Sequence, residues 1–292
     1  MIVGVVAKIH HTSAPELSRR IIAWLEQRGI QYRLGLEIAE RLGVAADDPV
    51  ILVDRDRFTS ICDVVVVLGG DGTMISVSRH PSERPSTIIG VNLGTLGFLT
   101  EITIDELFST LEAAVNGNVA REPRYLLSAE VKREGKIISR YTAINDVVIT
   151  KEALARIFSI ALWVDDQFAA TVRGDGVIVA TPVGSTAYSM AAGGSIVHPA
   201  VSALLVTSIC PHSLTSRPLV LPGKSTLRLT VSSATTEDEP EVYLTIDGQE
   251  GRGLTSGDEV IITTSDRFVY FAKSSSRSYF QVLATKLKWA NH

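Results

Sequence analysis

The chain has little of what marks several classes of protein. Its 292 residues include only two cysteines, Cys62 and Cys210, both in apolar surroundings, so we expect buried thiols in a reducing compartment rather than a disulfide. The six histidines show no metal-ligand spacing, which argues against a histidine-built metal centre. The 28 basic residues are outnumbered by 32 acidic ones and form no basic cluster, so nucleic acid is not expected as the main partner.

Long apolar runs are missing as well. No apolar stretch reaches the length that a membrane-spanning helix needs, and the apolar start at 2–8 lacks the charged leader and cleavage site of a signal peptide. Hydrophobic residues make up 45% of the chain and charged residues 21%, as in an ordinary globular protein, and the length is sufficient for two domains. We therefore expect a cytoplasmic protein without membrane contact.

The most informative segment is 64–73, where a valine-rich run ends in the sequence Gly-Gly-Asp-Gly-Thr. The run predicts a strand buried on both faces, as in a parallel sheet covered by helices. A helix predicted from Met74 onward would direct free N–H groups of the glycine loop toward a phosphate. A carboxylate there repels phosphate, so Asp71 predicts a metal ligand or a base that takes a proton from an attacking hydroxyl. The alternative is a strand–turn–helix connection that binds nothing.

A second glycine-spaced loop, within 90–98, follows the next predicted strand at 88–92. Loops after neighbouring parallel strands meet at the carboxyl edge of a sheet, so we expect both loops to line one crevice. Asp71 in that crevice favours phosphoryl transfer over passive phosphate binding.

Two kinds of pattern divide the chain. Up to about residue 120, strands and helices alternate, and Ser-x-x-Glu or Thr-x-x-Glu capping boxes at 13–16 and 103–106 predict helix starts. After Pro123, short strands alternate with turns, including a hairpin signal at Glu134-Gly135. We expect an α/β domain with a parallel sheet at 1–122 and an all-β layered, sandwich-like domain at 123–274. The tail 275–292, helical at 278–288, is expected to pack on the first domain.

The β-rich part carries three polar clusters. Asn145-Asp146 offers donors and acceptors to a pair of vicinal hydroxyls, although a turn in which both side chains bond their own backbone is the favoured alternative. The segment 181–188 could present N–H groups and the Tyr188 ring to a flat base, or simply cap a helix at Ser185 or Thr186. Asp247-Gly248 is typical of a turn at the end of a strand.

Taken together, these segments resemble the NAD kinases over nearly the whole chain. The matching motifs, in order, are 69–73, 90–100, 145–146, 181–188, 216–219 and 286–289. Val183 departs from the family pattern, which has threonine or serine there. The resemblance implies transfer of the terminal phosphate of ATP to the 2′-hydroxyl of the adenosine ribose of NAD, giving NADP. It also implies a homo-oligomer, commonly a dimer or tetramer. Because the donor phosphates carry negative charge, we expect a divalent metal ion, Mg²⁺, to balance it together with the amides of 69–73.

The resemblance also gives roles to residues. Asp71 corresponds to the essential aspartate, as base or through the metal, and Asn145 with Asp146 corresponds to a ribose-binding pair. Gly69, Gly70 and Gly72 form the phosphate loop. The residues assigned to substrate binding are Gly72, Thr73, Phe98, Asn145, Asp146, Arg173, Asp175, Ser185, Thr186, Ala187, Tyr188, Asp247 and Gln249.

Two other functions share part of this pattern. A lipid kinase has the same glycine loop but would need membrane-surface features, and the chain has no basic amphipathic segment. A nucleotide sensor without activity would need no base, against which Asp71 argues.

Overall fold

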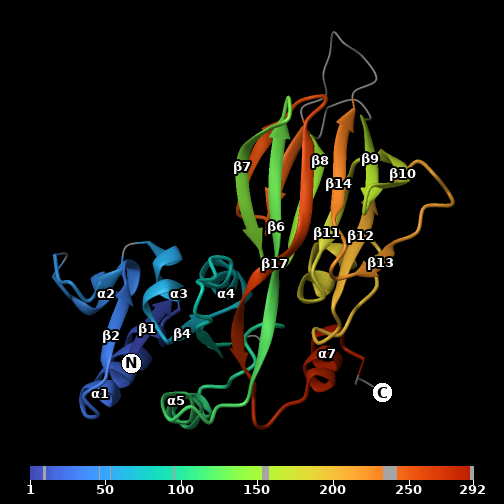
Figure 1. The fold of residues 1–292 in the computed structure, drawn as a ribbon. Helices are drawn as coiled ribbons and strands as arrows, with labels where there is room; N and C mark the ends of the chain where they lie inside the picture. The colour runs from blue at the N-terminus through green and yellow to red at the C-terminus, as the bar shows by residue number, and fades with distance from the viewer. Residues whose placement is uncertain are drawn as a thin grey trace. The chain divides into compact units, whose positions relative to one another are not determined.

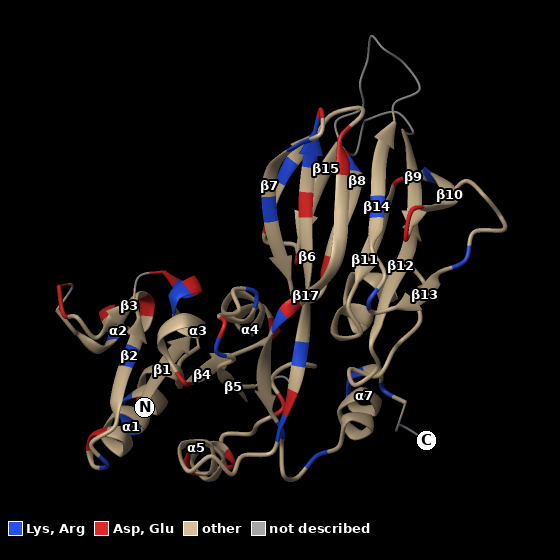
Figure 2. Cartoon of the chain, viewed as in Figure 1, with Lys and Arg blue, Asp and Glu red and all other residues tan. Residues whose placement is uncertain are grey.

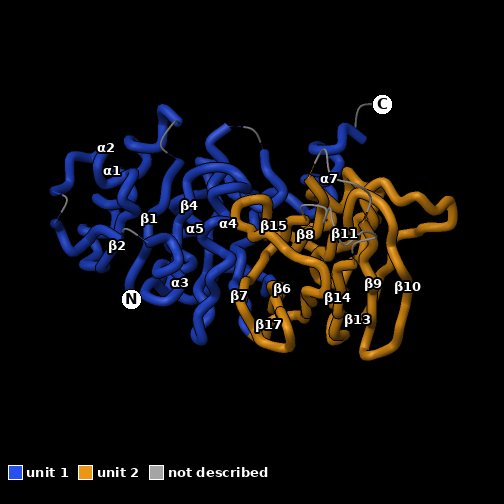
Figure 3. The backbone as a smooth tube through the Cα atoms, turned by 90° about the horizontal axis from the view of Figure 1, so that it is seen from above, with its two compact units in different colours: residues 1–124, 267–292 blue, residues 125–266 orange. Residues whose placement is uncertain are grey.

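The computed structural model describes residues 1–8, 11–45, 47–52, 54–94, 96–152, 158–232 and 242–289. The chain divides into two compact units (Figure 3). Unit 1 comprises residues 1–124 and 267–292, and unit 2 comprises residues 125–266. The polar, acidic sequence of 232–240 predicts a solvated loop; this stretch lies outside the described residues except for Ser232, which ends a strand. Among the described residues, no helix is both long enough and apolar enough to cross a membrane.

Unit 1 contains a parallel sheet in the order β3-β2-β1-β4-β5, with the end of β17 beside β5 (Figure 1). The strands are β1 (Ile2–Ala7), β2 (Gln31–Gly35), β3 (Ile51–Leu52), β4 (Val64–Gly69) and β5 (Thr87–Asn92). Every residue of β4 is buried, and β4 and β5 carry no charged side chain (Figure 2). This confirms the expectation from the valine-rich run, because a strand covered on both faces needs no polar alternation.

Unit 1 also contains the helices of the α/β pattern. They are α1 (Ala14–Glu26), α2 (Leu36–Leu42), α3 (Phe58–Ile61), α4 (Asp71–Ser78), α5 (Leu107–Val115) and α7 (Tyr279–Leu287), with a 3-10 turn at Arg55–Arg57. Leu17, Ile21 and Leu25 of α1 recur at helical spacing and join the core that also contains Val3 and Val5. The tail helix α7 belongs to unit 1, as the sequence indicated.

The two predicted capping boxes of unit 1 have different outcomes. The hydroxyl of Thr103 accepts the N–H of Glu106 at 3.3 Å, and the Glu106 carboxylate accepts the N–H of Thr103 at 3.1 Å, which confirms the second box. At the first box the predicted helix start is confirmed, since α1 begins at Ala14, but the capping bonds are not: the Ser13 hydroxyl bonds the His11 ring at 2.8 Å instead of a helix amide. The backbone of Ser13 is already helical (φ −84°, ψ −12°), whereas a capping residue needs an extended backbone.

Unit 2 consists of two antiparallel sheets. One has the order β10-β9-β14-β17 with β6 and β7 joined through β17, and the other has the order β13-β12-β11-β8-β15-β16. The strands are β6 (Arg121–Arg133), β7 (Lys136–Ala143), β8 (Asp146–Lys151), β9 (Phe158–Val164), β10 (Gln167–Gly174), β11 (Gly176–Ala180), β12 (Ala203–Ile209), β13 (Leu219–Pro222), β14 (Leu227–Ser232), β15 (Val242–Ile246), β16 (Glu250–Leu254) and β17 (Glu259–Ala272). The layered β architecture expected from the sequence is therefore confirmed.

Alternation along the strands decides which side chains enter the core of unit 2. Val147 and Ile149 of β8 join a core with Leu227 and Leu229 of β14 in the other sheet. Because side chains alternate, Val148 lies on the opposite face, in a second cluster with residues of β11 and β12. A 3-10 turn (Val183–Thr186) and helix α6 (Tyr188–Ala191) follow β11 directly. This outer face carries the site described below.

Several expectations for unit 2 need correction. The sequence predicts two strands, at 260–264 and 268–272, but they are one continuous strand, β17, because the polar residues between them stay extended in the sheet. The last residues of β17, from Arg267 onward, belong to unit 1. Strands β3, β8, β13 and β16 were not predicted. Cys62 is buried as expected, but Cys210 is exposed because it sits in a bend after β12 with φ of 42°.

Candidate active site

Asp71 connects the two glycine-rich loops of unit 1. It begins α4 directly after β4, where a negative side chain is favoured by the helix dipole. Its Oδ2 accepts the N–H of Phe98 at 2.9 Å, and its Oδ1 accepts the N–H of Leu99 at 3.0 Å. The loops after the neighbouring parallel strands β4 and β5 therefore converge, as the sequence predicted.

Two glycines make this convergence possible. A Cβ on Gly97 would lie 2.1 Å from Oδ1 of Asp71, so any side chain there would displace the carboxylate. A Cβ on Gly69 would lie 2.9 Å from the Thr73 hydroxyl, which is tighter than van der Waals contact allows. Glycine at both positions is required by close approach rather than by an unusual backbone angle.

The tail helix reaches the second glycine loop. The ammonium of Lys286 on α7 lies 5.5 Å from the centre of the Phe98 ring, a cation–π contact. The backbone N–H of the same Phe98 donates to Asp71. Lys286, which lies in the tail motif 286–289, therefore contacts the loop that holds Asp71 in place.

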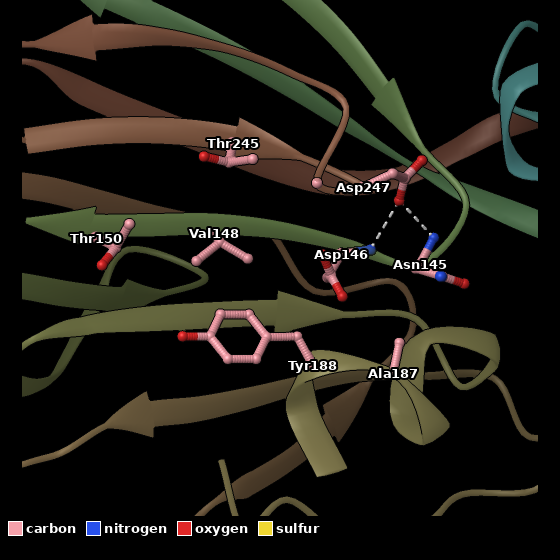
Figure 4. Close-up of a pocket in the computed structure, with 9 residues that line it drawn as sticks. Asn145, Asp146, Val148, Thr150, Ala187, Tyr188, Thr245 and Asp247 are labelled. Carbon is pink, nitrogen blue, oxygen red and sulfur yellow. Dashed lines mark hydrogen bonds between the residues drawn. The ribbon is translucent and has the colours of Figure 1, made fainter. Parts of the chain in front are cut away.

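Unit 2 contains a pocket of about 330 Å³ on the outer face of β8 and β15 (Figure 4). It is lined by Asn145, Asp146, Val148, Thr150, Ala187, Tyr188, Thr245, Asp247 and Gly248. The Tyr188 ring, 45% exposed, forms one wall with Val148 close by (Figure 4). Five residues assigned from the sequence thus meet in one cavity: Asn145, Asp146, Ala187, Tyr188 and Asp247.

Asn145 and Asp146 carry unused hydrogen-bonding capacity. Oδ1 of Asn145 is buried and has no hydrogen-bond partner among the described residues, nor does the Asp146 carboxyl have one there. Asp146 is only 4% exposed, and burial, followed by the negative charge of Asp247, raises the pKa of its carboxyl to about 7. The turn expected to satisfy both side chains with their own backbone is therefore wrong, and a polar ligand would supply the partners.

Asp247 bonds the backbone of this turn. Its carboxylate accepts the N–H groups of Ile144 at 3.0 Å, Asn145 at 2.8 Å and Asp146 at 3.0 Å. Asp247 itself lies in the turn after β15, as predicted, with a φ of 50°.

Five assigned residues of unit 2 do not line the pocket: Arg173, Asp175, Ser185, Thr186 and Gln249. The Ser185 hydroxyl is buried and bonds the backbone of Val197 instead of capping a helix, while the Thr186 hydroxyl bonds the Val183 carbonyl at 3.3 Å. Asp175 pairs with Lys151 at 3.5 Å, at the far end of β8 from Asp146. Arg173 is the second-last residue of β10, which ends at Gly174. Gln249 lies in the turn between β15 and β16.

Sequence reasoning missed Val148, Thr150, Thr245 and Gly248 of the pocket lining. A period-two pattern starting at Asp146 would have placed Val148 and Thr150 on the same face, but 146–151 was not identified as a strand. No group of three or more histidine, cysteine, aspartate or glutamate residues able to hold a metal occurs among the described residues.

Comparison with known proteins gives a consistent match. Residues 3–119 match the ATP-NAD kinase N-terminal domain, and residues 144–274 match the ATP-NAD kinase C-terminal domain. The NAD kinase of Syntrophotalea carbinolica is 42% identical over 287 residues, 98% of each chain. The NAD kinase of Geobacter sulfurreducens is 42% identical over 291 residues, again 98% of each chain.

Solved structures agree. Yeast NADH kinase, in a crystal structure with NADH, has a TM-score of 0.88 and 26% identity, covering 100% of this chain and 88% of that one. An NAD kinase from Archaeoglobus fulgidus, solved with ATP, has a TM-score of 0.75 and 22% identity, covering 99% of each chain, and shows the shared fold. On the domain matches and the full-length identity, this chain belongs to the ATP-NAD kinase family.

Proposed function

We propose that this protein transfers the terminal phosphate of ATP to the 2′-hydroxyl of the adenosine ribose of NAD, producing NADP. The observation that carries this proposal is the pocket of unit 2, where the buried Oδ1 of Asn145 has no hydrogen-bond partner among the described residues and the buried Asp146 lies beside the exposed ring of Tyr188. A ribose offers vicinal hydroxyls that both donate and accept, and an adenine offers a flat face to an aromatic ring. Family membership supports the same substrate.

Asp146 is the group we assign to a ribose hydroxyl. An ionised carboxylate accepts hydrogen bonds only, and the Asn145 amide supplies the complementary donors as well as an acceptor. Ala187 and Tyr188 are the remaining assigned residues that line the cavity. For Arg173, Asp175, Ser185, Thr186 and Gln249 we propose support of the surrounding backbone rather than contact with NAD, since none lines the pocket.

Asp71 is the group we assign to the proton of the attacking hydroxyl. Each of its carboxylate oxygens accepts one backbone N–H, and Oδ1 also accepts the Thr100 hydroxyl at 3.4 Å, which fixes its orientation and leaves a lone pair of Oδ2 for a proton or a metal ion. A sugar hydroxyl is a weak nucleophile at neutral pH, so a base within hydrogen-bond reach accelerates the reaction roughly 10²–10⁴-fold.

The donor set suits Mg²⁺ that arrives with the nucleotide. Mg²⁺ usually binds through one or two carboxylates together with substrate phosphates, rather than in a cage of protein ligands. Asp71 is the carboxylate at the α4 N-terminus, and the described residues contain no larger acidic or histidine cluster. When bound, the ion would neutralise charge on the transferred phosphate. The backbone of Gly69, Gly70 and Gly72 and the Thr73 hydroxyl remain the proposed phosphate contacts.

The test is product formation. Purified protein is incubated with NAD, ATP and MgCl₂, and NADP is measured with an NADP-specific dehydrogenase. We expect NADP to accumulate with ATP and to be absent when nucleotide is omitted. Parallel reactions with inorganic polyphosphate and with NADH define the donor and acceptor ranges. Absence of product with every donor would refute the proposed function, and binding to anionic vesicles in that case would point to a lipid kinase instead.

A further inference from the structure

The turn that carries Asn145 and Asp146 is held by a single side chain. The Asp247 carboxylate accepts three successive backbone N–H groups at 2.8–3.0 Å, from Ile144, Asn145 and Asp146. The backbone N–H of Asp247 in turn donates to the carbonyl of Asp146 at 2.9 Å. Four hydrogen bonds therefore link the turn after β15 to the turn before β8.

Asp247 is poorly disposed to bind a ligand itself. A carboxylate offers about four lone-pair sites, and three are already used by amides of the turn. Its Oδ1 points to the backbone N–H groups of Asn145 and Asp146, whereas the Asp146 side chain points toward Ala187 and Tyr188 (Figure 4). The substrate-binding role assigned to Asp247 from the sequence thus changes to an indirect one.

The carbonyls of the same turn are held from the other side. The Thr181 hydroxyl donates to the carbonyl of Ile144 at 2.6 Å, and the Thr181 N–H donates to that of Asn145 at 2.9 Å. A Cβ on Gly184 would lie 2.1 Å from the Asn145 carbonyl oxygen, so the 181–184 segment packs directly on the turn. With Asp247 taking the N–H groups and Thr181 the carbonyls, the turn has one orientation.

We propose that Asp247 is a positioning residue for NAD: it fixes the 144–146 turn so that the Asn145 and Asp146 side chains face the substrate. This inference rests on the proposed function. Among the residues that line the pocket, the other ionisable groups are Asp247 from the β15 turn and Tyr188 from α6, while Lys151 and Asp175 form an ion pair at the other end of β8.

The charge effect has a definite sign. The ionised form of Asp146 is the one that accepts hydrogen bonds from ribose hydroxyls, so NAD binding should strengthen as pH rises. The charge of Asp247 opposes that ionisation, and burial opposes it more. Removing the charge of Asp247 should therefore move the pH midpoint of NAD binding downward.

Asp247→Asn tests the inference. Asparagine tolerates the φ of 50° at this position, but it has one acceptor oxygen, and its amide would face backbone N–H groups. We expect the dissociation constant for NAD at pH 8.5, where Asp146 is ionised in both proteins, to rise at least tenfold. The pH midpoint of NAD binding should fall, and hydrogen exchange of the 144–146 amides should accelerate. The KM for ATP should stay unchanged.

Asp165→Asn is the matched control. Asp165 also has a positive φ (48°) and also accepts a backbone N–H, that of Thr226 at 2.8 Å, but it does not line the pocket. Its variant should leave NAD affinity, pH midpoint and exchange at 144–146 as in wild type. Wild-type-like affinity and pH midpoint in Asp247→Asn would overturn the inference. Failure of the wild-type protein to bind NAD would instead overturn the proposed function on which it rests.

Discussion

At the residue scale, the Asp71 carboxylate combines two tasks that a substitution should separate. It accepts one N–H from Phe98 and one from Leu99, and we assign it the proton of the ribose hydroxyl. Asp71→Asn keeps the size but removes the base, so we predict a fall in kcat of roughly 10²–10⁴-fold. The lone oxygen of asparagine also leaves one amide unpaired, which should lower stability by about 1–3 kcal/mol. Steady-state kinetics and thermal melting measure the two effects, and a melting change with unaltered kcat would assign Asp71 a structural role alone.

Gly97 tests how accurately Asp71 must be placed. A Cβ at this position would lie 2.1 Å from Oδ1 of Asp71, so Gly97→Ala has to move the carboxylate. Because misplacement by about 1 Å costs on the order of 10²-fold in rate, we predict a comparable loss of kcat. Gly94→Ala is the control in the same loop, since its Cβ would meet only the His11 ring at an ordinary 3.6 Å. Equal activities of the two variants would contradict the prediction.

Asp146 should make the unliganded protein less stable at alkaline pH. Its folded-state pKa, about 7, lies above the ordinary value of 3.8, so the folded state holds the proton more tightly than the unfolded state does. The contribution of Asp146 to the stability of the folded state is complete below pH 3.8 and is lost as pH rises to about 7. We predict that Asp146→Asn raises stability by roughly 1–4 kcal/mol at pH 8 and little at pH 4. Urea titrations at both pH values measure the free energy of unfolding, with the exposed Asp166→Asn as control. Equal gains in stability of Asp146→Asn at pH 4 and pH 8 would contradict the prediction.

At the element scale, Glu106 fastens the segment that leads into α7. Its Oε1 accepts hydrogen bonds from the Ser274 hydroxyl at 2.7 Å and from the N–H groups of Ser275 and Ser276 at 3.1 Å. Although burial alone would raise the pKa of Glu106, bonds from Thr103, Ser274 and Ser276 outweigh it and lower this pKa to about 2. This link contributes stability above pH 4.5 that is lost as pH falls toward 2.

We predict that Glu106→Gln lowers the melting temperature at pH 7 and removes part of the acid sensitivity below pH 4.5. Lys286 on α7 contacts Phe98, which donates to Asp71, so loosening the tail should also lower kcat. Melting curves between pH 3 and 7 and kinetics at pH 7 give the measurement. The neighbouring exposed Asp105→Asn is the control, and an unchanged melting temperature in Glu106→Gln would contradict the expected link.

Helices and strands were predictable from the sequence where a local residue pattern determines the backbone conformation. They were not predictable where contacts with residues distant in the chain determine it. The run before Gly69 could only be a buried strand, and the positive φ angles of Glu134 and Gly135 suit the predicted hairpin. The motifs at Ser13 and Thr103 look alike, yet only the one at Thr103 forms its reciprocal hydrogen bonds, because the Ser13 hydroxyl bonds the His11 ring instead. The role of Asp247 was hidden for another reason: its amide partners are about a hundred residues away in the chain.

At the scale of the whole molecule, both ends of the chain build unit 1. Residues 267–292 return to it after unit 2, and Tyr270 and Phe271 pair with Thr87 and Ile88 of β5. The parallel sheet is thus completed by a strand nearly two hundred residues further along the chain. Pairing across such separations is slow to form, so folding of unit 1 should be limited by the return of the C-terminal segment.

Unit 2 leaves apolar side chains at the edge of one sheet. β13 is an edge strand, and its Val220 is 54% exposed, while Leu214 in the preceding loop is 96% exposed. Uncovered apolar edge strands favour association, so covering is expected. Phe168, on the edge strand β10 of the other sheet, is 55% exposed but already packs against Trp163 at 5.3 Å. We therefore predict that, in the expected homo-oligomer, copies of this chain would contact one another at the β13 edge rather than at β10.

Val220→Glu tests this assignment. A charge on β13 would have to be buried unpaired against the partner, at a cost of several kcal/mol, so the oligomer should dissociate into smaller species. Light scattering after size-exclusion chromatography measures the mass, and circular dichroism verifies that each variant is folded. Phe168→Glu places the same charge on the other edge strand and should retain the wild-type mass. If Phe168→Glu dissociates the assembly and Val220→Glu does not, the interface lies at β10; if wild type is monomeric, the exposed edge at β13 serves some other contact.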